Sequence, residues 1–310
     1  MTDPAQTTNK TIGVIAALMS AVLFGLNAVG SKQLFAPPPV MDATALFVAR
    51  GAWSLPLFLG LAILARPRPI PAITQRDILL FLMSGATFGP GSIALSALGA
   101  ASTSAAHAVM LLSLFPPLAA FLASIFLREN LSRLAIASVV VGVSGALFLA
   151  LSRSAGGSSW YGDALIAGFI FTWALLTLGI RQLDAKYPAL FVVGVFGTIG
   201  ALMLVLMGFA MGRADAILIP AHRFDFRTVL WFDLELVVFL SVVAQLLQAA
   251  ALRNLPVAFV VALTSYGSIF AGLIASVTLL GETISPSEWI AGVLLLGALG
   301  LSLMDRYRAA

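Results

Sequence analysis

The sequence contains no cysteine and few charged residues. Without cysteine, the chain cannot form disulfides, iron–sulfur clusters, thiolate zinc sites or a cysteine nucleophile. Only 10% of its 310 residues are charged, whereas soluble domains carry about 25%. It also lacks an Asp-rich metal box, a His-Glu-x-x-His motif and a glycine-rich phosphate loop, so we expect neither a metal nor another cofactor. Since 60% of the residues are hydrophobic, membrane lipid is the expected surrounding.

Largely uncharged apolar runs recur along the chain at lengths that suit a bilayer. The hydrocarbon core is roughly 30 Å thick and needs about 20 apolar residues per helix. Solidly apolar runs predict helices, because membrane barrel strands are alternating segments of ~10 residues. We expect spans at 11–34, 42–65, 77–98, 102–127, 132–152, 160–181, 188–211, 229–252, 257–281 and 286–305. The sequence therefore predicts an all-α, multi-pass protein of the cell membrane with ten transmembrane helices.

The basic residues are divided unequally between the two sides of this arrangement. Lys and Arg in short loops mark the cytoplasmic side of a membrane. The side that holds the N-terminus receives eleven of them and the other side five, and Arg50 lies inside the second span. Both termini are therefore predicted to be cytoplasmic. The net charge of +4 reflects this distribution, and we expect no nucleic-acid partner.

The two halves of the chain resemble each other. The segment "LRENLS" (127–132) matches "LGETIS" (280–285) in leucine, glutamate and serine at an offset of 153. Three further pairs share an offset of 149: Gly13 with Gly162, Gly25 with Ala174, and Lys32 with Arg181. We expect residues 1–155 and 156–310 to form two five-helix repeats. Because five is odd, the second repeat enters the membrane from the opposite face, which is the inverted architecture of many secondary transporters.

These paired segments also resemble a known family. The segments that show this resemblance are "PPLAAFLASIFLRENLS" (116–132) with "IFAGLIASVTLLGETIS" (269–285), and "LFGLNAVGSK" (23–32) with "TWALLTLGIRQ" (172–182). The pattern is similar to the EamA family of the drug/metabolite transporter superfamily, and most similar to its YddG-type exporters of aromatic and other amino acids. Arg128 departs from the glycine that the family favours before the glutamate. The resemblance implies a basket-like fold in which spans 1, 3, 4, 6, 8 and 9 line the path.

Polar and aromatic side chains inside the spans are the candidates for substrate binding. Burying a polar group in lipid costs several kcal/mol unless it finds a partner. The candidates are Asn27, His107, Trp173, Gln245, Gln248 and Tyr266. The amides equally suit hydrogen bonds between helices, worth roughly 0.6–2 kcal/mol, and the aromatic residues equally suit core packing. His107 either binds a neighbouring carbonyl or takes part in a proton-linked step.

Three ionisable residues have competing interpretations. Arg50 could hold a substrate carboxylate, although a position at the outer interface is favoured. Glu129 and Glu282 could act as gates. The structural alternative is favoured for both, because each occupies a turn, and Ser285-Pro286-Ser287-Glu288 is a capping box that begins the last helix.

The scarcity of charged residues inside the spans limits the classes of substrate that we expect. No carboxylate lies at the centre of a span, which disfavours a proton-driven exporter of cationic drugs. A single intramembrane arginine disfavours a phosphate or nucleotide-sugar carrier. Small zwitterionic metabolites fit best, amino acids above all, with other metabolites or drugs as the alternative within the superfamily. A membrane enzyme is a distant rival, because Gly142-Val143-Ser144-Gly145 resembles the serine motif of rhomboid proteases. A passive channel is a further alternative.

Overall fold

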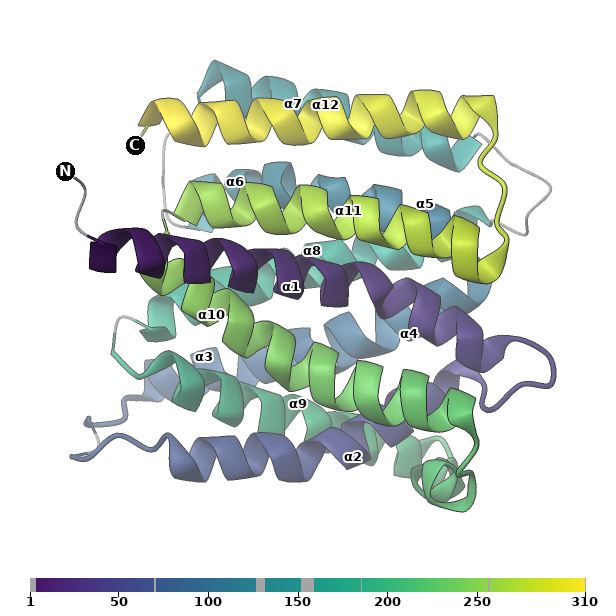
Figure 1. Cartoon of the computed structure of the whole chain (residues 1–310). Coiled ribbons are helices and arrows are strands. Elements are labelled where there is room, and N and C mark those ends of the chain that lie inside the picture. Colours follow the sequence, from purple (N-terminus) through teal and green to yellow (C-terminus); the bar gives the residue numbers. More distant parts are fainter. Residues whose placement is uncertain are drawn as a thin grey trace.

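The computed structural model describes residues 4–69, 71–126, 132–151, 159–184, 186–255 and 257–309. Every regular element in these residues is helical, and together they build ten helical spans (Figure 1). Eight of the spans are long and apolar enough to cross a membrane, and the apolar stretches Ile136–Leu151 and Pro286–Leu301 are shorter. The predicted all-α fold with ten helices is confirmed.

The first half contains five spans, two of which change helix type along their length. They are α1 (Pro4–Phe35); α2 (Ala43–Leu64); a third span of α3 (Gln75–Ala86), the π-helical η1 (Thr87–Ala94) and α4 (Leu95–Ser102); a fourth span of α5 (Ala105–Leu111), the 3₁₀ turn η2 (Leu112–Leu114) and α6 (Phe115–Phe126); and α7 (Arg133–Leu151). Pro90 lies within the π-helical stretch, and Pro116 lies in the first turn of α6. Pro56 lies inside α2, which continues through it.

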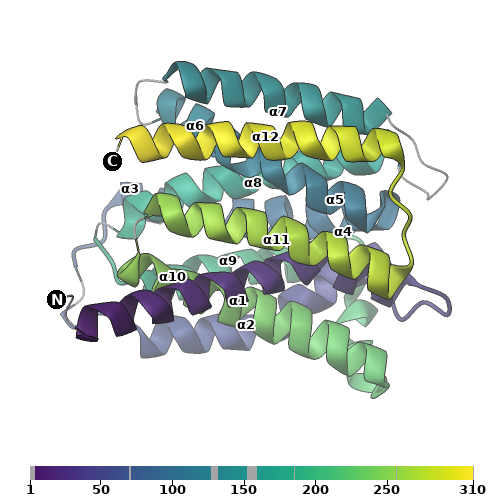
Figure 2. The ribbon, with the colours of Figure 1, turned by 45° about the horizontal axis from the view of Figure 1, so that its top comes forward.

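The second half repeats this plan. Its spans are α8 (Trp160–Asp184); α9 (Ala189–Ala210); an eighth span of the π-helical η5 (Thr228–Val243) and α10 (Ala244–Asn254); α11 (Val257–Leu280); and α12 (Pro286–Ala309). Two 3₁₀ turns, η3 (Ala214–Leu218) and η4 (Pro220–His222), lie between α9 and η5. The chain's two ends lie at the same end of the bundle, here called the termini end, and the opposite one is the far end (Figures 1 and 2).

The helices of the two halves pack in a crossed pattern. α2 packs along α9 and α7 along α12, so equivalent helices of the halves pair with each other. α1 packs on the eighth span and α11, and α8 packs correspondingly on the third and fourth spans. This pattern is the one expected when two copies of a unit are related by a two-fold axis in the membrane plane.

Glycines bring some of these helices into backbone contact. A Cβ on Gly89 would lie 2.3 Å from the carbonyl oxygen of Gly200, so the third span and α9 touch where the Gly85-x-x-x-Gly89 motif predicts close approach. Gly208 likewise faces Val48 on α2. Gly212 has a different use, because its φ of 67° suits the left-handed residue that follows the end of α9.

Candidate functional site

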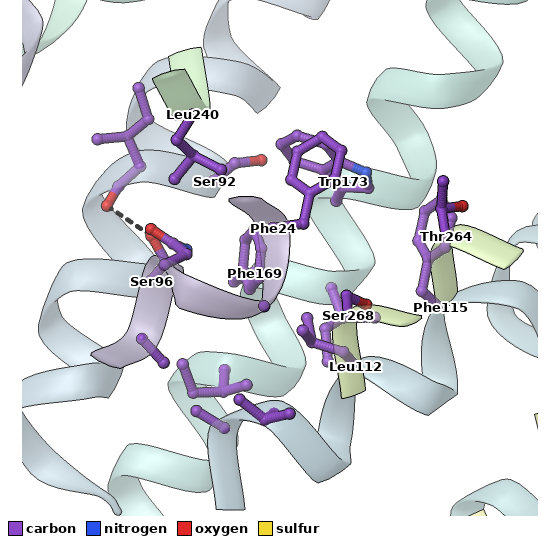
Figure 3. Close-up of a pocket in the computed structure, with 18 of the residues that line it drawn as sticks. Phe24, Ser92, Ser96, Leu112, Phe115, Phe169, Trp173, Leu240, Thr264 and Ser268 are labelled. Carbon is purple, nitrogen blue, oxygen red and sulfur yellow. Dashed lines mark hydrogen bonds between the residues drawn. The ribbon is translucent and has the colours of Figure 1, made fainter. Parts of the chain in front are cut away.

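A cavity lies between the two halves, about midway along the spans (Figure 3). It holds about 1100 Å³ of space not filled by atoms, open solvent at its mouth included. Its lining comes from α1, α2, α8, α11 and the third, fourth and eighth spans. These are the six spans that the sequence resemblance implies for the path, with α2 in addition. None of the described lining residues belongs to α7, α9 or α12.

One wall of the cavity is apolar and aromatic. The fourth span and α8 contribute only hydrophobic and aromatic side chains to it, among them Phe115, Phe169 and Trp173. The ring of Trp173 meets those of Phe24 and Phe169 edge to face, with centroids 5.7 and 5.9 Å apart (Figure 3). This aromatic group fixes the indole at the cavity surface, where it can contact an apolar part of a ligand.

The polar side chains of the lining, here called the polar wall, come from other elements. They are Asn27 on α1, Arg50 on α2, Ser241, Gln245 and Gln248 on the eighth span, and Thr264, Ser265 and Ser268 on α11, and the third span adds Ser92 and Ser96. The hydroxyl of Ser268 donates to the carbonyl oxygen of Ser265, so its own oxygen can still accept a hydrogen bond. A ligand in the cavity therefore meets both hydrogen-bonding groups and aromatic rings, and most of the two kinds come from different helices.

Two serines mark equivalent irregularities in the two halves. Ser92 in η1 donates to the carbonyl oxygen of Thr87 at 2.7 Å, and Ser241 in η5 donates to that of Leu236 at 2.8 Å. Each bond reaches back five residues, as π-helical geometry allows, and both serines line the cavity. π-Helical turns within α-helices are frequent at functional sites.

The cavity is closed at the far end. There, Val29 of α1, Ala105 of α5 and Ala275 of α11 belong to one packed cluster that joins the halves. Toward the termini end, the buried residues fall into two separate clusters among the described side chains. One is formed by α1, α10 and α11 around Ala17, and the other by α6 and α8 around Ala174. The walls thus separate in the direction of the termini.

The closure is reinforced by a hydrogen-bonded bridge. Glu282, between α11 and α12, accepts hydrogen bonds from the backbone N–H groups of Ala105 and Ala106, both at 2.8 Å. These N–H groups lie in the first turn of α5 and have no partner within their own helix. The carboxylate therefore caps a helix of the other half.

The model of the EamA-like transporter family matches the chain twice, over residues 11–151 and 160–304. The chain belongs to the EamA-like transporter family. It is accordingly a multi-pass membrane transporter of small molecules and not an enzyme. A solved structure described as "Crystal structure of protein" shares its fold, with 16% identity, a TM-score of 0.52, and coverage of 96% of this chain and 98% of the other. None of the curated proteins compared with the chain matches it.

The cavity of this EamA-like transporter brings together four of the six candidate residues. Asn27, Gln245 and Gln248 lie on the polar wall, and Trp173 lies on the aromatic wall. Tyr266 is outside the lining, and its hydroxyl donates to the carbonyl oxygen of Leu296 on α12 at 3.4 Å.

His107 also lies outside the lining. It is completely buried in the first turn of α5, where its Nδ1 is 3.2 Å from a carboxylate oxygen of Asp163 and its Nε2 is 2.7 Å from one of Glu288. Thr103 donates to the other oxygen of Asp163 at 2.5 Å. The two carboxylates come from the first turns of α8 and α12, so this cluster ties three spans together at the far end. These partners could not be predicted from the sequence, since each residue lies near the end of a different span.

The remaining ionisable residues are placed as follows. Glu288 forms the predicted capping box, accepting from the N–H of Ser285 at 2.6 Å, while its own N–H donates to the Ser285 hydroxyl at 3.3 Å. Arg50 does not reach the outer interface, which was the favoured interpretation; it is 7% exposed and faces the cavity. Ser144 is exposed on α7, outside the cavity. Arg128 and Glu129 lie outside the described residues.

Proposed function

We propose that the protein exports neutral, zwitterionic amino acids, aromatic ones among them, by alternating access to the central cavity. The observation that carries this proposal is the division of the cavity into a polar wall and an aromatic wall. An amino acid has the same division, with two charged groups at one end and a side chain at the other.

In this proposal, Asn27, Gln245 and Gln248 bind the polar end of the substrate and Trp173 contacts its side chain. Amides offer both donors and acceptors, so one wall can serve an ammonium and a carboxylate group. None of the described residues forms a hydrogen bond with the side chains of Gln245 and Gln248, which leaves both amides available to a ligand. The halves 1–155 and 156–310 would exchange conformations to open the cavity at alternate ends.

Flux measurements on the purified protein in liposomes test this proposal. We expect labelled phenylalanine and leucine to cross faster than through protein-free liposomes and to be recovered unmodified. In Trp173→Ala, the preference for phenylalanine over alanine should fall roughly three- to tenfold, because aromatic pairs contribute about 0.5–1.5 kcal/mol beyond their burial. Gln245→Ala should reduce the transport of all amino acids.

The matched control is Trp53→Ala. Trp53 lies on α2 outside the cavity lining, and its Nε1 donates to the carbonyl oxygen of Ile217 at 3.0 Å. Its removal should leave substrate preference unchanged. The absence of flux for every amino acid in the panel, with the protein folded, would refute the proposal.

A further inference from the structure

Arg50 is the one charged residue among the described residues that line the cavity. It lies on α2, and the residue as a whole is 7% exposed. An arginine cannot shed its proton under ordinary conditions, so it stays a cation wherever it is buried. Intramembrane cations are costly and are placed facing a bundle interior or a cavity, where they find partners.

The partners that the protein itself supplies to Arg50 are few and distant. Its Nε and Nη2 atoms lie 3.4 Å from the Ser241 hydroxyl oxygen, and Nη1 lies 3.4 Å from Oδ1 of Asn27. Hydrogen bonds of this kind are normally 2.7–3.2 Å long, and both acceptors are neutral. The guanidinium carries five N–H donors, so much of its capacity remains unused.

No carboxylate among the described residues forms an ion pair with Arg50. Glu235 on η5 is the acidic residue that acts on it electrostatically. That side chain is itself buried, at 6% exposure, and its Oε1 has no hydrogen-bond partner among the described residues. Glu235 therefore makes no ion pair with Arg50 in the described part of the chain, and the N–H donors of the guanidinium keep capacity for a further acceptor.

We propose that Arg50 binds the carboxylate group of the transported molecule, with Asn27 and Ser241 beside it. The planar fork of a guanidinium matches a carboxylate with two parallel hydrogen bonds, which gives orientation as well as affinity. The ligand class is thus a monocarboxylate whose apolar part extends toward Trp173. A phosphate would call for several cations, and this cavity offers one. This inference rests on the proposed function and names the group that binds the carboxylate of the substrate.

The test compares three probes that differ in one group each, in liposomes containing the full-length protein. L-phenylalanine has both charged groups, L-phenylalaninamide lacks the carboxylate, and 3-phenylpropanoate lacks the ammonium. We expect the wild type to carry phenylalanine at least about 30-fold more efficiently than the amide, because a buried charge that loses its partner binds much more weakly. Equal transport of phenylalanine and its amide would overturn the assignment of Arg50 and leave the proposed function standing.

Substitutions of Arg50 then test whether this side chain causes the preference for phenylalanine over its amide. Arg50→Gln should lower the ratio of phenylalanine to amide transport about tenfold or more, and Arg50→Lys, which keeps the charge without the fork, should restore part of it. The control is Arg213→Gln, because Arg213 pairs with Asp42 at 2.8 Å outside the cavity. It should keep the wild-type ratio. An unchanged ratio in Arg50→Gln would also overturn the assignment.

Two further outcomes separate the inference from the proposed function. If the wild type moves 3-phenylpropanoate but no amino acid, and Arg50→Gln abolishes that flux, Arg50 binds carboxylates and the proposed substrate is wrong. If Arg50→Gln does not fold, the comparison is made with Arg50→Lys, whose phenylalanine-to-amide ratio should fall between that of the wild type and unity. A wild-type ratio in Arg50→Lys would show that the fork contributes nothing.

Discussion

Replacing Glu282 by glutamine should loosen the far end of the cavity. The carboxylate bridges the two halves by accepting from the N–H groups of Ala105 and Ala106, both at 2.8 Å. Glutamine has almost the same shape, but it loses the negative charge and one of the two acceptor oxygens. If the termini are cytoplasmic, as the charge distribution predicts, this bridge stabilises the inward-facing state.

The size of the effect follows from the two bonds. A hydrogen bond to a charged group contributes about 1.5–3 kcal/mol, and a neutral one about 0.5–1.5 kcal/mol. Glu282→Gln loses one bond and weakens the other, and its partly exposed position favours the lower values. A loss of about 1.5–2 kcal/mol is reasonable. If the bridge exists only when the far end is closed, the ratio of far-end-open to far-end-closed molecules should rise about 13- to 30-fold.

The equilibrium between far-end-open and far-end-closed molecules can be measured by cysteine labelling, because the chain has no natural cysteine. A single cysteine introduced as Ser268→Cys would lie on the polar wall of the cavity. In proteoliposomes of known orientation, a membrane-impermeant maleimide should label it mainly from the termini end. With Glu282→Gln added, the rate of labelling from the far end should increase about 13- to 30-fold.

The control is Asp225→Asn. Asp225 caps η5 within a single span, accepting from the Thr228 N–H at 3.0 Å, and this bond holds the pKa of Asp225 below its usual range. Its loss removes a helix cap without removing a bridge between the halves. An unchanged far-end labelling rate in Glu282→Gln, or an equal increase in Asp225→Asn, would refute the role given to Glu282.

Two other substitutions test the packing of the bundle. His107→Gln leaves two buried carboxylates without their shared partner, which should cost about 3–5 kcal/mol and lower the melting temperature in detergent; an unchanged melting temperature would contradict the cluster. Gly25→Ala should destabilise the protein by about 1–3 kcal/mol, because the new Cβ would lie 2.4 Å from the carbonyl oxygen of Ser268. Gly60→Ala is its control, since nothing lies within 4 Å of the added carbon, and equal melting curves for the two glycine variants would refute this explanation.

The ten helices could be predicted from the sequence because lipid demands long apolar runs and continuous backbone hydrogen bonding. Asn27, Gln245 and Gln248 could be nominated for a related reason, since an amide inside a span needs a partner or a cavity. The serines of the polar wall gave no such signal. A serine can bond to its own helix, as Ser241 does, and then costs little wherever it lies.

Other features depend on spans that meet only in the folded chain. The ligands of His107 come from α8 and α12, and Glu282 caps α5 across a separation of 177 residues in sequence. Arg50 is expected at an interface when α2 is considered alone, because the sequence of one span does not show that α2 turns this face toward a cavity. Polarity within one span predicts that a residue matters, but its partners are set by the crossed packing of the halves.

The offsets that relate the halves carry a signal for the site itself. At an offset of 149, Phe24 corresponds to Trp173, Ser92 to Ser241 and Ser96 to Gln245; at 153, Leu112 corresponds to Ser265 and Phe115 to Ser268. All ten residues line the cavity. Equivalent positions of the two repeats therefore face the cavity, and the sequence alone is enough to pair them.

The two residues of a pair often differ in polarity, and this difference can orient a bound molecule. Two equivalent halves can exchange conformations at little cost, which alternating access requires. A lining with the same symmetry would bind a substrate equally well in two opposite orientations. The pairs of Leu112 with Ser265 and Phe115 with Ser268 break that symmetry, because the fourth span contributes apolar groups where α11 contributes hydroxyls. The scaffold can thus stay symmetric for movement while its lining orients a molecule with one polar end.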